Sequence, residues 1–241
     1  MTVLITGGSG KLGCELLKIF PDAIAPTHKE MDITNSDQVF KCIDHYKPTI
    51  IIHTAALTDI RFCEMNWKEA ENVNVGGTWH VLNAAEHVGA KIIFISTACV
   101  FDGEMGPYSE TDRPGPKNYY ALSKYAAEQL VQRYKRHLIV RTNFVPYSPW
   151  PYPAAFTDRY GTYLFAHDVA RAIPTTLSIE GIVHICGEDE MSMYNLARLT
   201  THSVLPMTLD DYSGPPLTRD MRLISNLFPP IKISGGDSKI C

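Results

Sequence analysis

The fold is decided by the stretch "TVLITGGSGKLGCELLKIF", residues 2–20. A β-branched apolar run comes first, then a turn with glycines at positions 7, 8, 10 and 13, then apolar residues at helical spacing. Glycines placed between a strand and a helix allow a tight turn, and they let backbone N–H groups approach a pyrophosphate at the positive end of the helix. The stretch therefore predicts a dinucleotide-binding βα unit, with a purely structural glycine turn as the alternative.

The same alternation of apolar runs and amphipathic stretches continues to residue 142. Further strands are expected at residues 23–27, 49–56, 90–97 and 137–142, and helices at 36–48, 67–88 and 118–134. Strands separated by helices need crossover connections, which produce a parallel sheet covered on both faces.

The chain changes character after residue 142. Four prolines fall within residues 143–156, which disfavours regular structure and marks a boundary. Beyond them we expect a helix at 167–177, a strand at 181–187 and a helix at 192–201, and the tail from residue 234 is expected to be frayed.

The expected fold is therefore α/β, a Rossmann-type doubly wound parallel sheet with a small, shortened C-terminal substrate lobe. Residues 1–145 form the NAD(P)-binding Rossmann domain in this interpretation. Residues 146–241 form the reduced substrate lobe, with 156–186 partly returning to the Rossmann sheet.

The composition, 45% hydrophobic and 20% charged, is typical of a soluble globular protein. A net charge of -4 argues against nucleic acid as the main partner. No apolar run approaches the roughly 20 residues that span a bilayer, and the N-terminus enters a strand without a basic leader, so neither a membrane anchor nor a signal peptide is expected. The six cysteines lack C-x-x-C spacing, which favours reduced thiols in a cytoplasm and no metal site. Trp67 and Trp79 are expected to be buried in core or lobe packing, with stacking on a base as the alternative.

The nature of the dinucleotide depends on the end of the second expected strand. An acidic residue there would select NAD by holding the ribose 2′-OH, but the chain reads Thr27-His28-Lys29. A basic side chain suits a 2′-phosphate, which favours NADPH, with NADH as the alternative cofactor. Lys29 as a solvated loop lysine is the competing interpretation, and Asp32 and Ile33 are expected to flank the adenine.

A tyrosine and a lysine stand four residues apart near the start of the helix expected at 118–134. At this spacing Tyr120 and Lys124 lie on one helical face, one turn apart. The pair alone has two interpretations. Lys124 either serves proton transfer by Tyr120 or pairs with Glu128 as ordinary helix decoration.

Six motifs occur in order: the glycine loop, "HTAALT" (53–58), "NVNVGGT" (72–78), "FISTACVFDG" (94–103), the Tyr120/Lys124 pair and "RTNFV" (141–145). Together they resemble the extended short-chain dehydrogenase/reductase superfamily, and within it the dTDP-4-dehydrorhamnose reductases. The resemblance covers residues 1–145 well and continues more thinly through 158–173, 180–187 and 218–225.

The resemblance implies roles for particular residues. Tyr120 would be the general acid, Lys124 would lower the pKa of Tyr120 and contact the nicotinamide ribose, and Thr97 would hydrogen-bond the substrate carbonyl oxygen. Ser96 points to the opposite face of the strand and is the less suitable hydroxyl. The implied cofactor-binding set is Gly7, Gly10, Lys11, Leu12, Gly13, Thr27, His28, Lys29, Asp32, Ile33, Ala55, Ala56, Asn74, Tyr120 and Lys124. The implied substrate-side set is Arg61, Ala98, Cys99 and Asn143.

Departures from the family pattern concern the substrate side. Ala98-Cys99 stand where the reductases carry Asp-Tyr, and Ile60-Arg61-Phe62 replace Val-Asp-Lys. A helix that normally follows the "RTNFV" segment is missing, which suggests an open or remodelled substrate pocket.

The resemblance implies an NADPH-dependent reductase of a nucleotide-activated 4-keto-6-deoxy sugar, with a homodimer left open. A dehydratase is disfavoured because Ala98-Cys99 cannot supply its acid/base pair. A nucleotide-sugar epimerase and a cofactor-binding regulatory subunit, resembling that of methionine adenosyltransferase, remain as alternatives. The shortened lobe favours the regulatory subunit, whereas the complete set of Thr97, Tyr120 and Lys124 favours the reductase.

Overall fold

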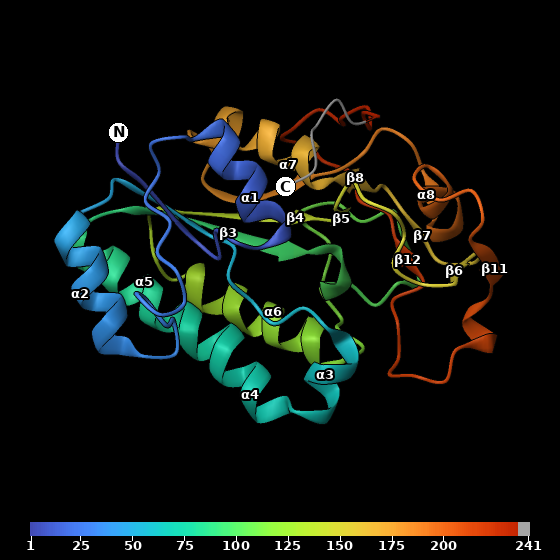
Figure 1. The fold of residues 1–241 in the computed structure, drawn as a ribbon, viewed down its shortest axis with the longest axis horizontal. Helices are drawn as coiled ribbons and strands as arrows, with labels where there is room; N and C mark the ends of the chain where they lie inside the picture. Colours follow the sequence, from blue (N-terminus) through green and yellow to red (C-terminus); the bar gives the residue numbers. More distant parts are fainter. Residues whose placement is uncertain (236–241) are drawn as a thin grey trace.

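A five-stranded parallel sheet forms the centre of the molecule in a computed structural model that describes residues 1–235 (Figure 1). Its strands, in spatial order, are β1 (Val3–Thr6), β2 (Ile50–His53), β3 (Lys91–Thr97), β4 (His137–Thr142) and β9 (Gly181–Ile185). All neighbouring pairs run parallel. Isoleucine, leucine and valine dominate these strands and are buried, as expected for a parallel sheet enclosed between two helical layers.

Helices cover both faces of this sheet. The layer above the sheet in Figure 1 contains α1 (Lys11–Ile19) and α7 (Ala166–Ala172), and the layer below contains α2 (Ser36–Tyr46), α5 (Gly77–Val88) and α6 (Tyr119–Val131). Leu16 and Val169 belong to the core of the first layer, and Ile43, Val81 and Ala127 to the core of the second. The predicted doubly wound α/β sheet is confirmed.

The strand expected at residues 23–27 is reduced to one bridge beside β1. Ile24 donates its N–H to the Val3 carbonyl at 2.9 Å and accepts from the Ile5 N–H at 2.8 Å. Pro26 follows two residues later and has no N–H to extend a ladder. The predicted extent of this strand was therefore wrong, and what remains of it is a bridge beside β1.

The helix expected at 67–88 is confirmed over its whole length, with one π-helical turn in its middle. The chain forms α3 (Ile60–Met65), α4 (Trp67–Glu71), a π-helical turn η1 (Asn72–Gly76) and then α5. Inside the π turn, the Asn74 side chain holds the backbone of Leu57. Such π turns often occur at functional sites. Trp67 and Trp79 are about half exposed, at 47% and 45%, so the expectation that they are buried was wrong.

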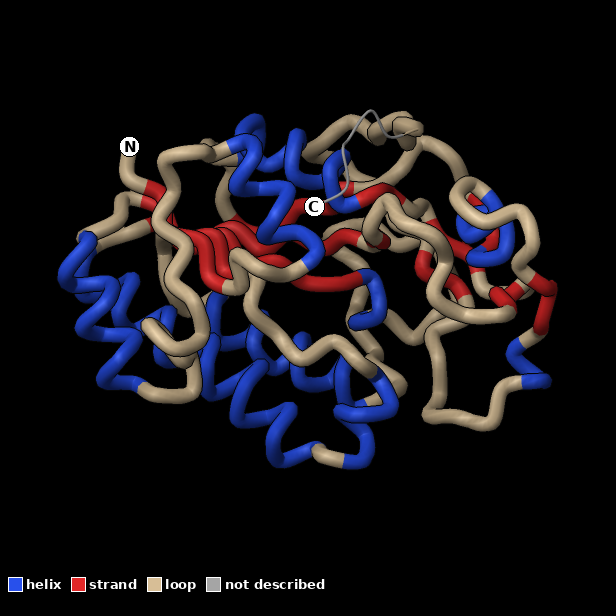
Figure 2. The backbone as a smooth tube through the Cα atoms, viewed as in Figure 1, coloured by secondary structure: helices blue, strands red, loops and turns tan. Residues whose placement is uncertain are grey.

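The C-terminal lobe consists of short strands joined by loops (Figure 2). Its strands form sheets of three and two strands, and β5 pairs with β8 beside the end of the main sheet. The elements are β5 (Phe144–Val145), β6 (Ala154–Phe156), β7 (Tyr160–Gly161), β8 (Leu164–Phe165), β10 (Met191–Ser192), α8 (Met193–Arg198), β11 (Leu205–Met207), the 3₁₀ turn η4 (Leu209–Asp211) and β12 (Asp220–Met221). Two further 3₁₀ turns lie outside the lobe: η2 (Ala98–Val100) follows β3, and η3 (Ile173–Thr176) follows α7.

Within residues 156–186, β9 pairs with β4 and α7 packs on α1, so this part of the chain contributes to the main sheet and its cover. The division at residue 145 stays a proposal. Of the tail expected to be frayed, Ser234 donates a hydrogen bond to Asp168 Oδ1 at 2.5 Å, and residues 236–241 lie outside the described part of the chain.

None of the helices between residues 1 and 235 has the length and apolar character that crossing a membrane requires.

Candidate active site

The glycine loop joins β1 to α1 by a turn that depends on small residues. Gly7 has φ +70°, and a Cβ at this position would lie 2.8 Å from the backbone nitrogen of Ala55. A Cβ at Gly13 would lie 2.2 Å from the Gly7 carbonyl oxygen. Gly10 is the N-cap of α1 and supplies no side chain to cap it. The first N–H groups of α1 therefore remain available to an anion, as the dinucleotide prediction requires.

Two further predicted residues begin α1. Lys11 is exposed at the first position of the helix. Leu12 is buried in the core above the sheet, so its side chain packs and only its backbone faces the loop. The loop after β2 closes the other side, where the Ala55 N–H donates to Thr6 Oγ1 at 3.3 Å. Ala56 follows it, half-buried.

The loop predicted to meet the adenosine ribose is exposed and contains an acid that sequence reasoning missed. Thr27, His28 and Lys29 are all exposed. The Glu30 carboxylate accepts hydrogen bonds from the Thr27 N–H at 2.7 Å and the Thr27 hydroxyl at 2.8 Å. The hydrogen bond from the Thr27 backbone is the main cause that lowers the pKa of Glu30. A negative charge therefore stands beside the basic pair.

The two residues predicted to flank the adenine have different environments. Asp32 is half-exposed and accepts hydrogen bonds from the N–H and the hydroxyl of Thr34, both through Oδ1. Ile33 is buried below the sheet, and a Cβ at Gly77 would lie 2.7 Å from its Cδ1. The Ile33 side chain thus serves packing against α5, and only Asp32 offers a polar side chain here.

Asn74 connects three elements beneath the glycine loop. Its Oδ1 accepts from the Leu57 N–H at 2.8 Å, and its Nδ2 donates to the Leu57 carbonyl at 3.0 Å and to Ser123 Oγ at 2.9 Å. These bonds use the amide fully. Asn74, predicted as a cofactor residue, therefore positions the loop after β2 against α6.

A buried histidine was missed by sequence reasoning although "HTAALT" contains it. His53 ends β2, and its Nδ1 lies 2.7 Å from Thr6 Oγ1 and its Nε2 3.0 Å from Thr78 Oγ1. Burial, followed by the charge of Lys124, lowers the pKa of His53 to about 3. A neutral imidazole therefore ties β1, β2 and α5 together at physiological pH.

The three predicted catalytic residues meet where β3 ends. Thr97 is the last residue of β3, and Tyr120 and Lys124 lie on the first turns of α6. Asn118 caps this helix by accepting from the Ala121 N–H at 2.9 Å, which fixes where the helix begins. The Thr97 hydroxyl lies close enough to the Tyr120 phenol to lower its pKa. The structure thus brings the threonine and the tyrosine together.

The electrostatics of Tyr120 are set mainly by its surroundings in the core. Burial is the main cause that raises the pKa of Tyr120 above its usual value, and the Cys99 and Cys63 thiols act in the same direction. Thr97 opposes this shift. Lys124 is not among the groups that shift the pKa of Tyr120 here, so its lowering effect stays a prediction. The phenol keeps its proton at neutral pH because the low-polarity surroundings disfavour the phenolate.

Lys124 is a buried cation with an unusual neighbour. The residue is 4% exposed, and Nζ lies 3.9 Å from the centroid of the Phe94 ring. Its ammonium has no hydrogen-bond acceptor among residues 1–235. Burial lowers the pKa of Lys124 to about 7, which the charge of Glu128 only partly offsets.

The alternative pairing of Lys124 with Glu128 is not formed. Glu128 binds Arg141 instead, with Arg141 Nη2 2.7 Å from Oε2, and it accepts from Ser96 Oγ at 2.5 Å. Ser96 and Thr97 therefore point to opposite faces of β3, as the strand alternation predicted. The carboxylate that could have explained Lys124 as decoration is occupied.

The substrate-side residues are only partly brought together. Ala98 and Cys99 follow Thr97 in η2 and are buried, and Cys99 Sγ lies 3.5 Å from Met221 Sδ. Asn143 Nδ2 lies 3.7 Å from the same sulfur. Arg61 is elsewhere. It is exposed on α3, with its guanidinium carbon 5.2 Å from the ring centroid of Tyr212 in the C-terminal lobe.

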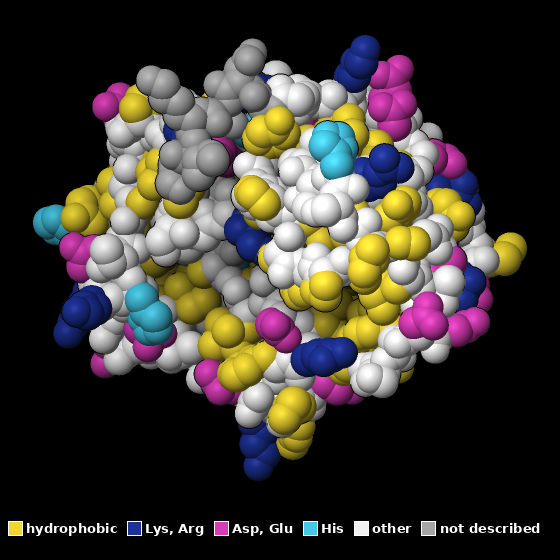
Figure 3. Space-filling view, turned by 45° about the vertical axis from the view of Figure 1, so that its right-hand side comes forward, with side chains coloured by type: hydrophobic (Ala, Val, Ile, Leu, Met, Phe, Trp, Pro, Cys, Tyr) yellow, Lys and Arg dark blue, Asp and Glu magenta, His cyan; other side chains and the backbone are white. Residues whose placement is uncertain are grey.

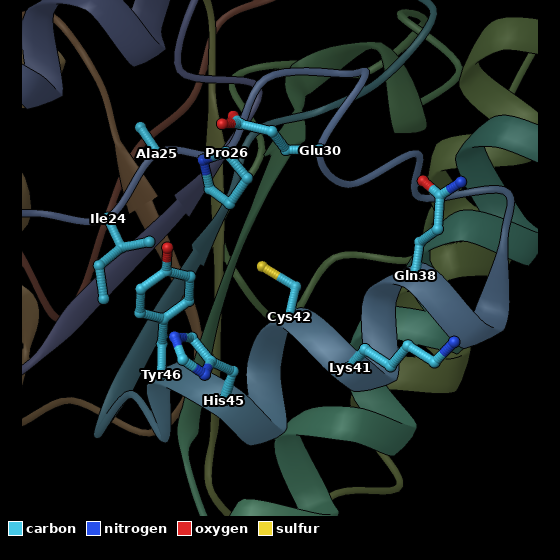
Figure 4. A pocket seen from close by; sticks show the side chains of 9 residues that line it. All are labelled: Ile24, Ala25, Pro26, Glu30, Gln38, Lys41, Cys42, His45 and Tyr46. Atoms are coloured by element: carbon cyan, nitrogen blue, oxygen red, sulfur yellow. The ribbon is translucent and has the colours of Figure 1, made fainter.

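The face of the molecule shown in Figure 3 is hollowed near its centre, where hydrophobic side chains line the hollow. A separate cavity of about 580 Å³ lies between the segment at residues 24–26 and α2 (Figure 4). Its lining consists of Ile24, Ala25, Pro26, Glu30, Gln38, Lys41, Cys42, His45 and Tyr46. None of the residues predicted to bind cofactor or substrate lines this cavity. This cavity is therefore separate from the predicted catalytic residues Thr97, Tyr120 and Lys124.

Within the described range 1–235, no three histidine, cysteine, aspartate or glutamate side chains are grouped as metal ligands.

Comparison with known proteins points to one family. The dTDP-4-dehydrorhamnose reductase of Aggregatibacter actinomycetemcomitans is 38% identical over 149 residues, which cover 59% of this chain and 51% of that enzyme. The chain thus spans about half the length of that relative. The spore coat polysaccharide biosynthesis protein SpsK of Bacillus subtilis (strain 168) is 30% identical over 239 residues, covering 88% of this chain and 84% of that protein.

Among solved structures, the dTDP-4-dehydrorhamnose reductase of Bacillus anthracis str. Ames in complex with NADP superimposes with a TM-score of 0.89. It is 26% identical, and the match covers 97% of this chain and 96% of that one. The family model described as RmlD substrate binding domain matches residues 1–152, more than half of the 241 residues. The chain therefore belongs to the RmlD substrate binding domain family, within the extended short-chain dehydrogenase/reductase superfamily.

Proposed function

We propose that this protein is an NADPH-dependent reductase of a nucleotide-activated 4-keto-6-deoxy sugar. One observation carries the proposal. Lys124 is buried without an acceptor among residues 1–235, one helical turn from Tyr120, whose pKa the nearby Thr97 hydroxyl lowers. An uncompensated buried amine destabilises a fold, so a ligand that supplies acceptors gives this position a purpose. The relatives named as dTDP-4-dehydrorhamnose reductases agree with this function.

The glycine loop and its surroundings fit a dinucleotide. The crowding that a Cβ would cause at Gly7 and Gly13, together with the uncapped start of α1, leaves backbone N–H groups where a pyrophosphate would be held. Asp32, Ala55 and the backbone of Leu12 would line the adenosine side, and Lys124 would donate to the nicotinamide ribose. Bound NADPH would supply the hydride that reduces the ketone.

Two side chains of the protein would hydrogen-bond to the carbonyl oxygen of the substrate. Tyr120 would donate its phenolic proton to the carbonyl oxygen as that oxygen gains negative charge, and Thr97 would hydrogen-bond to the same oxygen. The raised pKa of Tyr120 keeps the phenol protonated before reaction, as an acid must be. A charged Lys124 would favour the phenolate that remains.

The preference for NADPH over NADH rests on His28 and Lys29. Both are exposed, although His28 Nδ1 lies 4.0 Å from Asp32 Oδ2. Glu30 works against that phosphate, because its carboxylate is held in the same turn by Thr27. We therefore propose NADPH as the main cofactor and NADH as a usable one. Titration of both cofactors checks this, with a preference for NADPH that shrinks at high salt.

The identity of the sugar is proposed only as a class. Buried Ala98-Cys99 replace the Asp-Tyr of the family pattern, and Arg61 contacts Tyr212. We therefore propose poor turnover of the dTDP-linked substrate relative to another activated keto sugar. A substrate panel in which the dTDP sugar is clearly preferred would contradict this part.

A homodimer and a cytoplasmic location belong to the same proposal. Apolar side chains are exposed on neighbouring helices, with Met65 at 82%, Trp67 at 47% and Trp79 at 45%. Such side chains are typical of interfaces between subunits. Free thiols at five described cysteines fit a reducing compartment. Light scattering after size-exclusion chromatography checks the dimer.

A cofactor-binding regulatory subunit is the second candidate. The raised pKa of Tyr120 and the altered substrate side favour it. Purified protein decides between the two functions when it is mixed with NADPH and a 4-keto-6-deoxy sugar nucleotide. The reductase oxidises NADPH in proportion to the ketone consumed, whereas the regulatory subunit binds NADPH and leaves both unchanged.

A further inference from the structure

Arg159 is a buried cation in the C-terminal lobe with few acceptors. It lies between β6 and β7 and is 7% exposed. Its Nε donates to the Thr218 carbonyl at 2.9 Å, Nη1 lies 3.8 Å from Met193 Sδ, and Nη2 lies 3.2 Å from Met221 Sδ. Thioether sulfur is a weak acceptor, whereas a guanidinium carries five N–H donors. One carbonyl oxygen is therefore the only strong acceptor that this part of the chain, residues 1–235, gives Arg159.

Two acids near Arg159 bind other arginines: Asp158, its neighbour in the chain, and Asp220, which is paired with Tyr160 in the sheet. Asp158 Oδ2 lies 3.3 Å from Arg219 Nη2, and Asp220 Oδ2 lies 2.7 Å from Arg222 Nη2. Arg159 forms no ion pair with any residue between 1 and 235. A lysine in such a place could lose its proton, but an arginine cannot. The charge of Arg159 is thus buried and unmatched.

Other polar side chains converge on the same methionine. Met221 Sδ lies 3.7 Å from Asn143 Nδ2 and 3.5 Å from Cys99 Sγ, besides its contact with Arg159. The hydroxyl of Tyr163, a residue 1% exposed, has no hydrogen-bond partner among the described residues. An amide, a guanidinium and a thiol therefore share one flexible thioether as their common contact, and Tyr163 packs in the same cluster as Met221.

This group of residues adjoins the proposed catalytic residues. The Cys99 N–H donates to Thr97 Oγ1 at 3.1 Å, and Thr97 lies close enough to Tyr120 to lower its pKa. Asn143 directly follows β4, the neighbour of β3 in the sheet. The donors thus stand on the lobe side of the reaction centre, where a substrate would extend away from the carbonyl being reduced.

We propose that Arg159, supported by Asn143 and Tyr163, forms a subsite for an oxyanion of the ligand, with the Met221 thioether lying where that oxyanion binds. The class is a diphosphate or a sugar carboxylate, because both offer oxygens that a guanidinium binds in bidentate fashion. The term substrate for this ligand rests on the proposed function, but the binding itself does not. Met221, being unbranched and flexible, would move aside when the oxyanion enters.

Isothermal titration without any reaction tests the subsite. The probes are dTDP against thymidine, which differ by the diphosphate, and UDP-glucuronate against UDP-glucose, which differ by a carboxylate. The variants are Arg159→Met and, as a matched control, Arg219→Met, whose guanidinium is about half exposed. Arg159→Met should weaken the relevant oxyanion by about tenfold or more, the scale of a charge-assisted hydrogen bond. Arg219→Met should leave it unchanged.

The set of probes whose affinity falls shows whether the oxyanion is a diphosphate or a carboxylate. If Arg159 binds a diphosphate, Arg159→Met should bind dTDP, UDP-glucose and UDP-glucuronate all more weakly. If Arg159 binds a carboxylate, only the affinity for UDP-glucuronate should fall. The inference is overturned if folded Arg159→Met binds every probe like the unaltered protein, or if the unaltered protein binds no oxyanion probe more tightly than its uncharged counterpart.

Folding of the variant is checked separately. Removing an unmatched buried charge should keep or raise the melting temperature, so loss of binding in a more stable protein is the expected signature. If Arg159→Met is not recovered folded, Arg159→Gln keeps a donor for Thr218 while removing the charge, and the same outcomes apply. A protein that binds oxyanions through Arg159 but never oxidises NADPH retains this subsite and refutes the reductase proposal.

Discussion

Two successive turns of α6 each bury a charged side chain, but only one of the two charges has a partner among the described residues. Glu128, with no exposed surface, is matched by Arg141 and Ser96 at 2.7 and 2.5 Å. Lys124, one turn earlier, is 4% exposed and faces the Phe94 ring with no acceptor among residues 1–235. The two sites share one helix and one depth of burial, so the difference lies in their partners.

The difference separates structure from function. A matched buried pair fixes how α6 sits on β3 and β4, and its loss is a loss of stability. An unmatched buried amine contributes nothing to the fold, because burial penalises its charge without a compensating bond. Lys124 is therefore explained only by something that the folded chain alone does not contain.

The largest effect is expected from a substitution that breaks the buried Glu128–Arg141 pair. Glu128→Gln leaves Arg141 buried without its counter-charge and should lower the free energy of unfolding by about 3–5 kcal/mol. Urea denaturation measures it, with the exposed Glu86→Gln as the control. A loss below about 1 kcal/mol would show that the pair is not the structural anchor described here.

The next largest effect is expected at Tyr120, the proposed proton donor one turn before Lys124. Tyr120→Phe should lower kcat by about 10²-fold or more, while the affinity for NADPH stays nearly unchanged, because the hydroxyl acts on the substrate oxygen. Tyr119→Phe is the matched control one position earlier on the helix and should retain kcat. Near-normal turnover by Tyr120→Phe would remove the general-acid role.

Lys124→Met should stabilise the protein while damaging function. Burial lowers the pKa of Lys124 from 10.5 to about 7, so between these values the unfolded chain holds a proton that the folded chain does not. The stability of the unaltered protein should therefore rise with pH across this window, as proton linkage requires. The advantage of Lys124→Met should be largest below pH 7 and vanish near pH 10.5. Melting temperatures measured across this range check it, and an advantage independent of pH would contradict the assignment.

The smallest effects come from two neighbours on β3. Ser96→Ala removes one hydrogen bond to Glu128 and should cost about 1 kcal/mol of stability with no change in kcat. Thr97→Ala should do the reverse, lowering kcat by about tenfold, the scale of one hydrogen bond made in the transition state. Finding both effects in the same variant would mean that the two faces of β3 are not separated in function.

Most of the fold could be predicted from local sequence patterns. The glycine turn, the buried β-branched runs and the helix at 118–134 follow from periodicity and turn chemistry within short windows, so the sheet and its layers could be predicted. The reduction of the strand near Ile24 and the π turn around Asn74 could not, because both depend on partners far away in the chain. Leu57, which holds Asn74, lies 17 residues away from it.

The candidate site divides in the same way. Thr97, Tyr120 and Lys124 were found because their motifs resemble a known family. The raised pKa of Tyr120 was missed, since it arises from burial and from two thiols contributed by separate elements. Arg159 was missed because an arginine in a sequence does not reveal whether an acid will face it.

The most direct test is how much NADPH raises the melting temperature of three proteins. A ligand that binds only the folded state stabilises it according to its concentration and affinity. The unaltered protein and Tyr120→Phe should be stabilised equally, and Lys124→Met should be stabilised much less, because the ammonium would hold the ribose. Equal stabilisation of all three, or none in the unaltered protein, would contradict the claim that Lys124 is left unmatched for the cofactor.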